Sequence, residues 1–388
     1  MELTETQLSV RDLYRRYMTA ELEPRTPAFE SGEEPIFPFM KQMIEDLGLD
    51  AAADELARAG GAEGSKEGRT SEDEELRALV AFAQAQLIVE MARVNPGFCM
   101  SWGVSVGLCG GNIAKRGTPE QVATYVPPIA RGEKVGCWCL TEAGAGSDAF
   151  GSMKTRVKRD GDVYVMNGSK TFITNGPCGD IYLVYARDDE DGSIQAFIVE
   201  REFEGVSSGP PFKKMGMRSS PTSEIFFDDV RIPVENLLGS GSRDRDHVRK
   251  SLARERVGIA VMGYGIAERC FEIARNYAKE RVQGGQPIAN YQLVQHRLAR
   301  MYVDLANARR IVYGGPQAES ALDASAAKLY LGEVGTRVAT EAIHILAGYG
   351  YIEEYVVERL LRDAMLLELG GGTTEIQILT IARHILAE

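Results

Sequence analysis

Residues 137–176 read CWCLTEAGAGSDAFGSMKTRVKRDGDVYVMNGSKTFITNG. A loop of small residues at 141–148 is followed by two turn signals, Asp160-Gly161 and Asn167-Gly168. Such pairs favour tight hairpin turns because both residue types tolerate positive φ. A loop without large side chains lets a ligand approach the backbone, whose amides can bind anionic or carbonyl oxygens. The stretch therefore predicts β-structure that carries a cofactor-binding loop.

Short β-rich runs continue from this stretch to about residue 240. They lie at 163–165, 181–185, 195–199 and 224–227, with a further turn signal at Asp191-Gly192. We expect a small antiparallel β-domain over residues 131–240. For the loop at 141–148 taken alone, a flexible connection between strands is the alternative to a cofactor site.

Helical patterns precede the β-domain and predict a helical domain over residues 1–130. A helix at 76–93 should end before Asn95-Pro96-Gly97. Thr118-Pro119 predicts a new helix start, because threonine caps helices and proline fits the first turn. The segment 51–75 is rich in Ala, Gly, Glu, Ser and Lys and predicts an exposed excursion. The first two helices should bury two apolar faces: Leu8, Val10 and Leu13, and then Phe37, Phe39, Met40, Met43 and Leu47.

The helical period returns after the β-domain, and residues 241–388 predict a four-helix bundle. Helices are expected at 321–347, 355–369 and 375–387. The fold class is thus α+β, in the order helices, β-domain, helices. No G-x-G-x-x-G fingerprint occurs, so a nucleotide cofactor would not be held in Rossmann fashion. One bundle helix carries an apolar seam with spacings of three and four, at Tyr291, Val294, Leu298, Met301, Leu305, Ala308 and Val312.

The composition indicates a globular chain with a large core and an acidic surface. The 388 residues are 44% hydrophobic and carry a net charge of -12, which argues against general affinity for nucleic acid. No apolar run is long enough to span a membrane, and the N-terminus does not resemble a signal or transit peptide, so we expect a cytoplasmic protein without membrane partners. The six cysteines lie mostly in apolar contexts without C-x-x-C spacing, which favours buried thiols over disulfides or metal ligands.

A longer pattern combines Trp138, Thr141, Gly146 and Ser147 with the later triplet 172–174. It resembles the flavin-binding segment of the acyl-CoA dehydrogenase family. Residues 214–222, KMGMRSSPT, are similar to the K-x-G-x-R-x-S-x-T segment of that family. The resemblance implies an FAD cofactor held by Trp138, Leu140, Thr141, Gly146, Ser147, Phe172 and Thr174.

The C-terminal part resembles the same family in the segments that reach the FAD of a neighbouring subunit. Arginine suits this role because it clamps a pyrophosphate by paired, charge-assisted bonds, although Arg281 alone could be a solvated cation at a helix end. In HILAGYGY, residues 344–351, Ala347 stands where the family usually has glycine, and Gly284 stands where an aromatic is frequent. The resemblance implies a homotetramer or homodimer and cofactor contacts from Arg281, Gln292, His344, Gly348, Thr373 and Glu375.

The catalytic base is expected at Glu255. Many family members carry a glutamate before Gly-Thr in the C-terminal loop, and Gly371 occupies that position here. The subgroup that resembles isovaleryl- and long-chain acyl-CoA dehydrogenases places its base 26 residues before the arginine of the Glu-Arg flavin segment, which is Glu255 when counted from Arg281. An exposed ion pair is the alternative for Glu255, and Glu368 and Glu375 are weaker candidates for the base.

The resemblance implies dehydrogenation of an acyl-CoA to a trans-2-enoyl-CoA in fatty acid metabolism. Glu255 would remove the α-proton, the β-hydride would pass to flavin N5, and electrons would go to an electron-transfer flavoprotein. The carbonyl would be held by the flavin ribityl hydroxyl and the Gly371 amide, whereas Ser147 would contact pantetheine or flavin and Arg256 the CoA portion or the loop. The small Gly371 suggests room for branched acyl groups.

Three other functions are compatible with these residues. The chain could be a flavin oxidase or monooxygenase of the same fold, a DNA-associated relative without dehydrogenase activity, or an inactive subunit of a hetero-oligomer. The acidic charge and Glu255 argue against the second function, and the intact flavin and base positions argue against the third.

Overall fold

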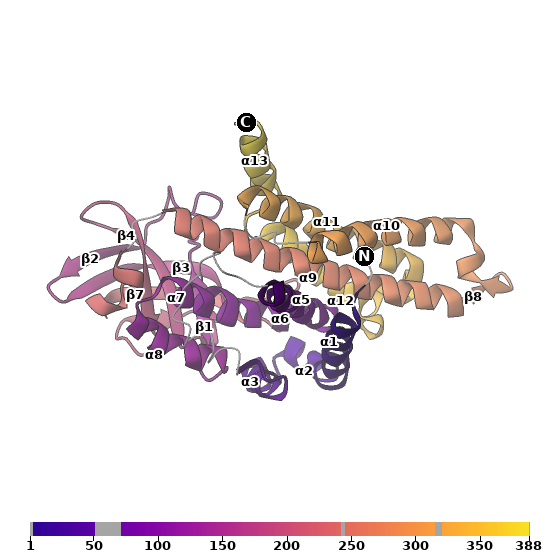
Figure 1. Ribbon diagram of the computed structural model, residues 1–388, viewed down its shortest axis with the longest axis horizontal. Coiled ribbons are helices and arrows are strands. Elements are labelled where there is room, and N and C mark those ends of the chain that lie inside the picture. Colours follow the sequence, from indigo (N-terminus) through magenta and orange to yellow (C-terminus); the bar gives the residue numbers. More distant parts are fainter. Residues whose placement is uncertain (1–2, 51–70, 242–244, 315–319, 388) are drawn as a thin grey trace.

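The computed structural model describes residues 3–50, 71–241, 245–314 and 320–387. A helical region comes first, a sheet follows, and long helices complete the chain (Figure 1). Most of the predicted excursion at 51–75 lies outside the described residues, and residues 71–75 begin a helix. The N-terminal helices are α1 (Glu5–Tyr17), α2 (Thr26–Ser31), α3 (Ile36–Asp46), α5 (Ser71–Val94), α6 (Pro96–Trp102), α7 (Gly111–Arg116) and α8 (Pro119–Ala130).

Both the start of α8 and the second apolar face agree with the prediction. Thr118 caps α8 in a reciprocal capping box with Gln121. The first apolar face was predicted wrongly, because Leu13 is 49% exposed. The chain continues from α1 into a π-helical turn at Met18–Leu22, and the buried stripe follows the four-residue spacing of Tyr14, Met18 and Leu22.

One sheet of seven strands forms the middle of the molecule: β1 (Gly136–Cys139), β2 (Arg156–Asp160), β3 (Val163–Thr174), β4 (Ile181–Asp188), β5 (Ile194–Glu200), β6 (Val206–Ser208) and β7 (Thr222–Pro233). All four predicted runs lie in strands. Most pairings are antiparallel as expected, but β4 pairs in parallel with β1 and β2. The connection from β1 to β4 contains the whole β2–β3 hairpin, and it is long enough for a parallel crossover.

The turns at Asp160-Gly161 and Asp191-Gly192 are confirmed, since each joins two antiparallel strands. The turn predicted at Asn167-Gly168 is wrong, because both residues lie inside β3 at a register shift against β7. A Cβ on Gly168 would lie 2.6 Å from the Thr155 Cα, so glycine is needed there for a close approach in a bulge.

The C-terminal region contains α9 (Arg245–Glu280), a short hairpin of β8 (Val282–Gln283) and β9 (Gln286–Pro287), α10 (Gln292–Tyr313), α11 (Ala321–Leu346), α12 (Val357–Leu369) and α13 (Thr374–Ile385). In Figure 1, α9 runs from beside the sheet to the opposite end of the molecule, where β8 lies. The predicted seam of α10 is buried at Met301, Leu305 and Ala308, whereas Tyr291 is exposed.

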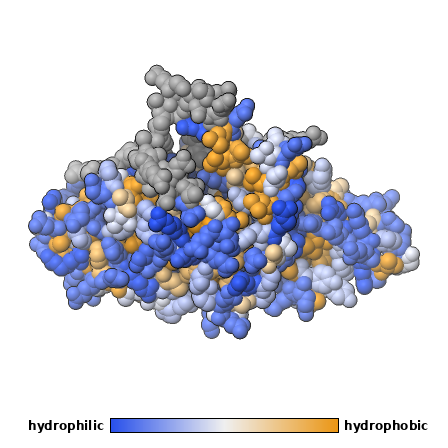
Figure 2. Space-filling view, turned by 60° about the horizontal axis from the view of Figure 1, so that its bottom comes forward, coloured by the Kyte–Doolittle hydropathy of each residue, from blue (hydrophilic) through white to orange (hydrophobic). Residues whose placement is uncertain are grey.

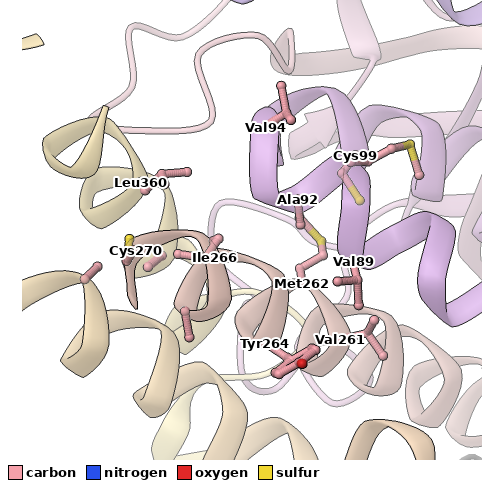
Figure 3. Close-up of a cluster of buried hydrophobic side chains, with 14 of the residues drawn as sticks. Val89, Ala92, Val94, Cys99, Val261, Met262, Tyr264, Ile266, Cys270 and Leu360 are labelled. Carbon is pink, nitrogen blue, oxygen red and sulfur yellow. The ribbon is translucent and has the colours of Figure 1, made fainter. Parts of the chain in front are cut away.

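The main core lies where the N-terminal and C-terminal helices meet. Figure 3 shows side chains of α5, such as Val89 and Ala92, beside Val261 and Met262 of α9, with Leu360 of α12 nearby.

All six cysteines are free, and only Cys178 among them is exposed. The face in Figure 2 is largely hydrophilic, with small hydrophobic groups of which the largest lies in the upper middle of the view. Within the described ranges, no helix is both long and apolar enough to span a bilayer.

Candidate active site

A cavity of about 540 Å³ opens between the sheet and the C-terminal helices. The loop after β1 forms one wall, and α9 with the loop before α13 forms the other. The cavity unites eight of the predicted site residues: Trp138, Leu140, Thr141, Gly146, Ser147, Glu255, Arg256 and Gly371. Residues up to 233 positions apart in the sequence therefore meet at one site.

A buried ion pair between Lys170 and Glu142 fixes the loop after β1. Lys170 on β3 donates to the Leu140 carbonyl at 3.1 Å and to the Glu142 carboxylate at 2.8 Å. Glu142 also accepts from the backbone amides of Lys154 and Thr155 at 2.6 and 2.9 Å. Burial opposes ionisation of Glu142, but its bonds to Lys170 and Thr155 prevail and lower its pKa. The loop is thus held through its own carboxylate.

The same loop contributes Thr141, Gly146 and Ser147 to the cavity wall, and its glycines leave open space beside the backbone. A Cβ added to Gly144 or Gly146 would meet no atom of the described residues within 4 Å. Trp138 is oriented by Tyr185, whose hydroxyl accepts from the indole nitrogen at 3.3 Å and whose ring lies edge-on at 5.7 Å. An aromatic ring and an accessible backbone in one cavity suit a planar, hydrogen-bonding ligand.

Glu255 projects from α9 into this cavity. Its Oε2 atom is buried and has no hydrogen-bond partner among the described residues. Burial raises the pKa of Glu255 to about 7, although the positive charges of Arg256 and Lys328 oppose the rise. A carboxylate with this pKa and a free oxygen can accept a proton near neutral pH.

Gly371 lies directly beside Glu255. A Cβ on Gly371 would come 3.7 Å from the Glu255 carboxyl carbon and 2.6 Å from Ile259 Cδ1. The family resemblance allows a base at position 255 or at position 371, and these two positions are therefore neighbours in the structure. A side chain at position 371 would contact Ile259 Cδ1, and the expectation that Gly371 leaves room for branched acyl groups stays a prediction.

Arg256 faces the C-terminal loop as well as the cavity. Its guanidinium donates to Ser325 Oγ at 3.1 Å and lies 3.4 Å from the Gly371 carbonyl oxygen. Of the two roles considered for Arg256, these contacts favour the one in which it supports the loop.

Four of the predicted cofactor residues do not line this cavity. Phe172 is 69% exposed and packs against Phe212, while the neighbouring Thr171 amide bonds the Thr141 carbonyl at 2.9 Å. Thr174 ends β3, where it pairs with Thr222 of β7. Thr373 caps α13, and Glu375 is exposed in the first turn of that helix.

Several residues that build or line this site were not predicted from the sequence. Lys328 and Gln377 bond the loop before α13 from inside the protein. Lys328 had a readable signal, because it interrupts the buried stripe of Ala324, Ala327 and Leu331 on α11. No motif distinguished the remaining lining residues, which include Phe150, Leu252, Ile376, Thr380, Arg383 and His384.

A second cavity of about 500 Å³ lies at the far end of α9 and contains other predicted site residues. Arg281 and Gly348 line it, and the Arg281 guanidinium lies 5.5 Å from the centre of the Tyr349 ring. His344 lies in the last turn of α11, just before the turn Ala347–Tyr351 that contains Gly348. Its Nδ1 atom lies 3.2 Å from an Arg297 nitrogen. Gln292 begins α10 nearby and is exposed.

The two cavities are far apart within one chain. Glu255 and Arg281 are separated by 26 residues, the intervening residues are helical to Glu280, and at about 1.5 Å per residue they lie roughly 40 Å apart. One subunit therefore presents two separate groups of predicted cofactor residues.

Sequence models of known families match the chain from end to end. The N-terminal domain of acyl-CoA dehydrogenase matches residues 4–133, the middle domain matches residues 137–230, and the C-terminal domain matches residues 246–386. A short-chain-specific acyl-CoA dehydrogenase of Clostridium acetobutylicum is 41% identical over 286 residues, covering 72% of this chain and 75% of the relative. An acyl-CoA dehydrogenase of Bacillus subtilis is 34% identical over 396 residues, covering 100% and 99%.

Solved structures agree with this match. Butyryl-CoA dehydrogenase from Megasphaera elsdenii superposes with a TM-score of 0.86 at 32% identity, covering 100% of this chain and 99% of the other. An acyl-CoA dehydrogenase of Bacillus anthracis complexed with FAD gives 0.87 at 29% identity, covering 100% and 68%. A chain from a structure titled as an electron transferring flavoprotein of Acidaminococcus fermentans gives 0.81 at 31%, covering 100% of both.

Proposed function

The chain belongs to the acyl-CoA dehydrogenase family, and we propose that it uses FAD to dehydrogenate an acyl-CoA thioester, with Glu255 as the base that removes the α-proton. The predicted α+β fold is the fold of that family, and the chain is an oxidoreductase. The observation that carries the proposal is the Oε2 atom of Glu255, which is buried without a hydrogen-bond partner among the described residues, in the cavity that the predicted flavin loop helps to form.

The cavity residues fit a flavin. The open backbone at Gly146 leaves room for a ligand to approach, and Trp138 adds an aromatic surface to the same cavity. We propose that Trp138, Leu140, Thr141, Gly146 and Ser147 hold the cofactor at this cavity, with Phe172, Thr174, Thr373 and Glu375 at its margins. Bound FAD would supply the acceptor for the hydride that leaves the β-carbon.

The residues of the chain would prepare the substrate for proton removal. The α-proton of a thioester is too weakly acidic for a carboxylate in water, so the site must exclude solvent and stabilise the developing charge on the carbonyl oxygen. Burial keeps Glu255 basic, with a pKa of about 7. The backbone amide of Gly371 is the proposed donor to the thioester carbonyl, and Arg256 and Gln377 hold the carbonyl group of the same residue.

We further propose that a second copy of the chain completes the cofactor site. Arg281, Gln292, His344 and Gly348 lie too far along the bundle to reach the first cavity of their own subunit, as the length of α9 requires. A homo-oligomer would bring the second cavity of one subunit to the first cavity of another. The proposed electron acceptor is an electron-transfer flavoprotein, a partner that fits the family and is supported by the similarity to a chain in the A. fermentans structure.

A Glu255→Gln variant tests the proposed base. Glutamine keeps the volume of the side chain but cannot accept a proton, so the purified variant should stay yellow and lose at least 1000-fold in acyl-CoA-dependent flavin bleaching, which is on the order of 4 kcal/mol of barrier. Stopped-flow absorbance measures the bleaching, with a small panel of acyl-CoA substrates.

A Glu368→Gln variant is the matched comparison, because Glu368 is a competing carboxylate at the end of α12. It should bleach at close to the wild-type rate. Wild-type bleaching in Glu255→Gln, or loss of bleaching only in Glu368→Gln, would refute Glu255 as the base. Hydrogen peroxide formed in step with substrate consumption would replace the electron-transfer flavoprotein by oxygen as the acceptor.

A further inference from the structure

Lys328 is a buried lysine that touches the loop beside the proposed base. It lies on α11 and is 1% exposed. Its ammonium donates to two backbone carbonyls, Glu368 O at 3.1 Å and Gly372 O at 2.8 Å. A buried ammonium costs free energy unless its surroundings compensate for the lost water, so its position beneath this loop calls for a functional explanation.

The loop that Lys328 contacts is held from several sides. Gly371 and Gly372 both adopt positive φ, at 64° and 92°. Gln377 donates to the carbonyls of Gly371 and Gly372 at 3.1 and 2.9 Å. The side chains of Lys328 and Gln377 thus fix the carbonyl groups of this loop. Without these bonds its backbone would be mobile, because it contains three consecutive glycines.

Lys328 also lies within the electrostatic surroundings of Glu255. The charged groups that act on Lys328 are Glu368 of α12, Arg256 and Glu255 of α9, and Glu375 of α13. Its charge in turn opposes the rise in the pKa of Glu255 that burial causes. Burial lowers the pKa of Lys328 itself to about 8, so it is still mostly charged at neutral pH.

We propose that Lys328 is a positioning residue of this site: it holds the 370–372 loop against Glu255, and its positive charge favours the ionised, proton-accepting form of that carboxylate. The inference rests on the proposed function of the cavity. It makes two separable statements, one about the position of the loop and one about the charge of Glu255.

Three substitutions separate the loop contact from the charge. Lys328→Gln removes the charge and keeps a donor, Lys328→Met removes both, and Lys328→Arg keeps the charge. Lys158→Gln on the exposed side of β2 is the control for loss of a lysine charge elsewhere. Flavin absorbance and thermal unfolding would be recorded for each variant, so that a loss of fold is recognised.

The first measurement is the ionisation of Glu255 in protein without substrate. The infrared carboxyl band that disappears in Glu255→Gln would be followed against pH. We expect its midpoint to rise by about one pH unit in Lys328→Gln and Lys328→Met, and to stay near the wild-type value in Lys328→Arg and in the control. A midpoint unchanged in Lys328→Gln overturns the statement about charge, even if Lys328→Met does not fold.

The second measurement is the pH dependence of acyl-CoA-dependent flavin bleaching. Lys328→Gln should recover most of the wild-type rate above the shifted midpoint, whereas Lys328→Met should remain at least tenfold slower at every pH because the loop has lost its donor. Equal rates in the two variants overturn the statement about the loop. If Glu255→Gln bleaches normally while the infrared midpoint still rises in Lys328→Gln, the assignment of the base fails and the inference about Lys328 stands.

Discussion

Asp363 is a second buried carboxyl group that lacks full hydrogen bonding. Its Oδ1 atom accepts from the Met217 amide, and its Oδ2 atom has no partner among the described residues. Burial, together with the nearby negative charge of Glu30, raises the pKa of Asp363 to about 7. The group lies where α12 meets the segment before β7, so its ionisation affects the packing of two regions.

The raised pKa of Asp363 predicts a pH-dependent stability. Because the folded protein holds the proton more tightly than the unfolded chain does, the stabilisation is complete below about pH 4 and is lost as the pH rises through 7. Asp363→Asn cannot ionise, so between pH 5 and 8 its stability should fall less than that of the wild type, by on the order of 3 kcal/mol. Urea unfolding followed by circular dichroism at several pH values measures this difference.

Glu255→Gln is the comparison for this prediction, since Glu255 has a raised pKa of the same sign in another part of the molecule. Its effect should add to that of Asp363→Asn in the double variant. Parallel pH profiles of the wild type and Asp363→Asn would show that the carboxyl group of Asp363 is already ionised at pH 5.

Single residues differed in how far the sequence could predict them. Glu255 and Gly371 were assigned by position in family segments, and the structure brings them side by side, although their roles are still predictions. Lys328 interrupts the apolar stripe of α11, which is a local sign of burial, but its role could not be assigned, because a lysine on a helix usually extends along the surface to reach water. Its burial depends on carbonyl groups about 40 and 44 residues later, which no local pattern contains.

The contact between α9 and α11 depends on a missing side chain. A Cβ on Gly263 would come 2.3 Å from the Leu331 carbonyl oxygen, and a Cβ on Gly335 would come 3.4 Å from the Gly263 Cα. The two helices therefore approach one another through glycine, at the centre of the bundle that supports the cavity wall.

Gly263→Ala should destabilise the protein by about 2 kcal/mol or more, because the backbone of α11 must move to admit the methyl group. Gly258→Ala is the matched control on the same helix, since a Cβ there would meet no atom within 4 Å in the part of the chain that the structure describes. Alanine should leave stability unchanged or raise it by up to about 1 kcal/mol at that position. Equal destabilisation of the two variants in thermal unfolding would contradict a close contact at Gly263.

The sequence predicted the elements better than their pairings. Period and capping residues identify a helix or strand locally, as Thr118 does for α8. The pairing of β1 with β4 joins residues such as Cys137 and Tyr182, whose contact depends on how a long connection folds. Asn167-Gly168 shows the limit of a two-residue signal, because positive φ serves a bulge as well as a turn.

At the scale of the whole molecule, each subunit carries two incomplete halves of the proposed cofactor site. The first half contains Glu255 and the loop after β1, and the second contains Arg281 and the turn after α11. They lie at opposite ends of α9 (Figure 1). The division into regions 1–130, 131–240 and 241–388 stays a proposal, and the first half of the site lies between the last two of these regions.

A shared site predicts that two inactive variants can restore activity together. Glu255→Gln damages the first half, and Arg281→Ala damages the second. After joint unfolding and refolding of equal amounts with FAD, about one quarter of all sites should combine two intact halves if subunits pair at random. Acyl-CoA-dependent bleaching of the mixture would measure the recovery.

The control mixture pairs Glu255→Gln with Lys328→Met, because both changes affect the first half and no combination is intact. It should show only the sum of the two separate activities. The same lack of recovery with Arg281→Ala would mean that each subunit holds its cofactor alone.

The continuous helix between the two halves has a consequence for how the chain can vary. Each residue inserted into or removed from α9 between Glu255 and Arg281 would turn one half by about 100° relative to the other and move it by about 1.5 Å. Substitutions along α9 leave the relative orientation of the two halves unchanged, whereas a change in the length of α9 does not. Related sequences should therefore differ in length within their connections and preserve the count of residues along this one segment.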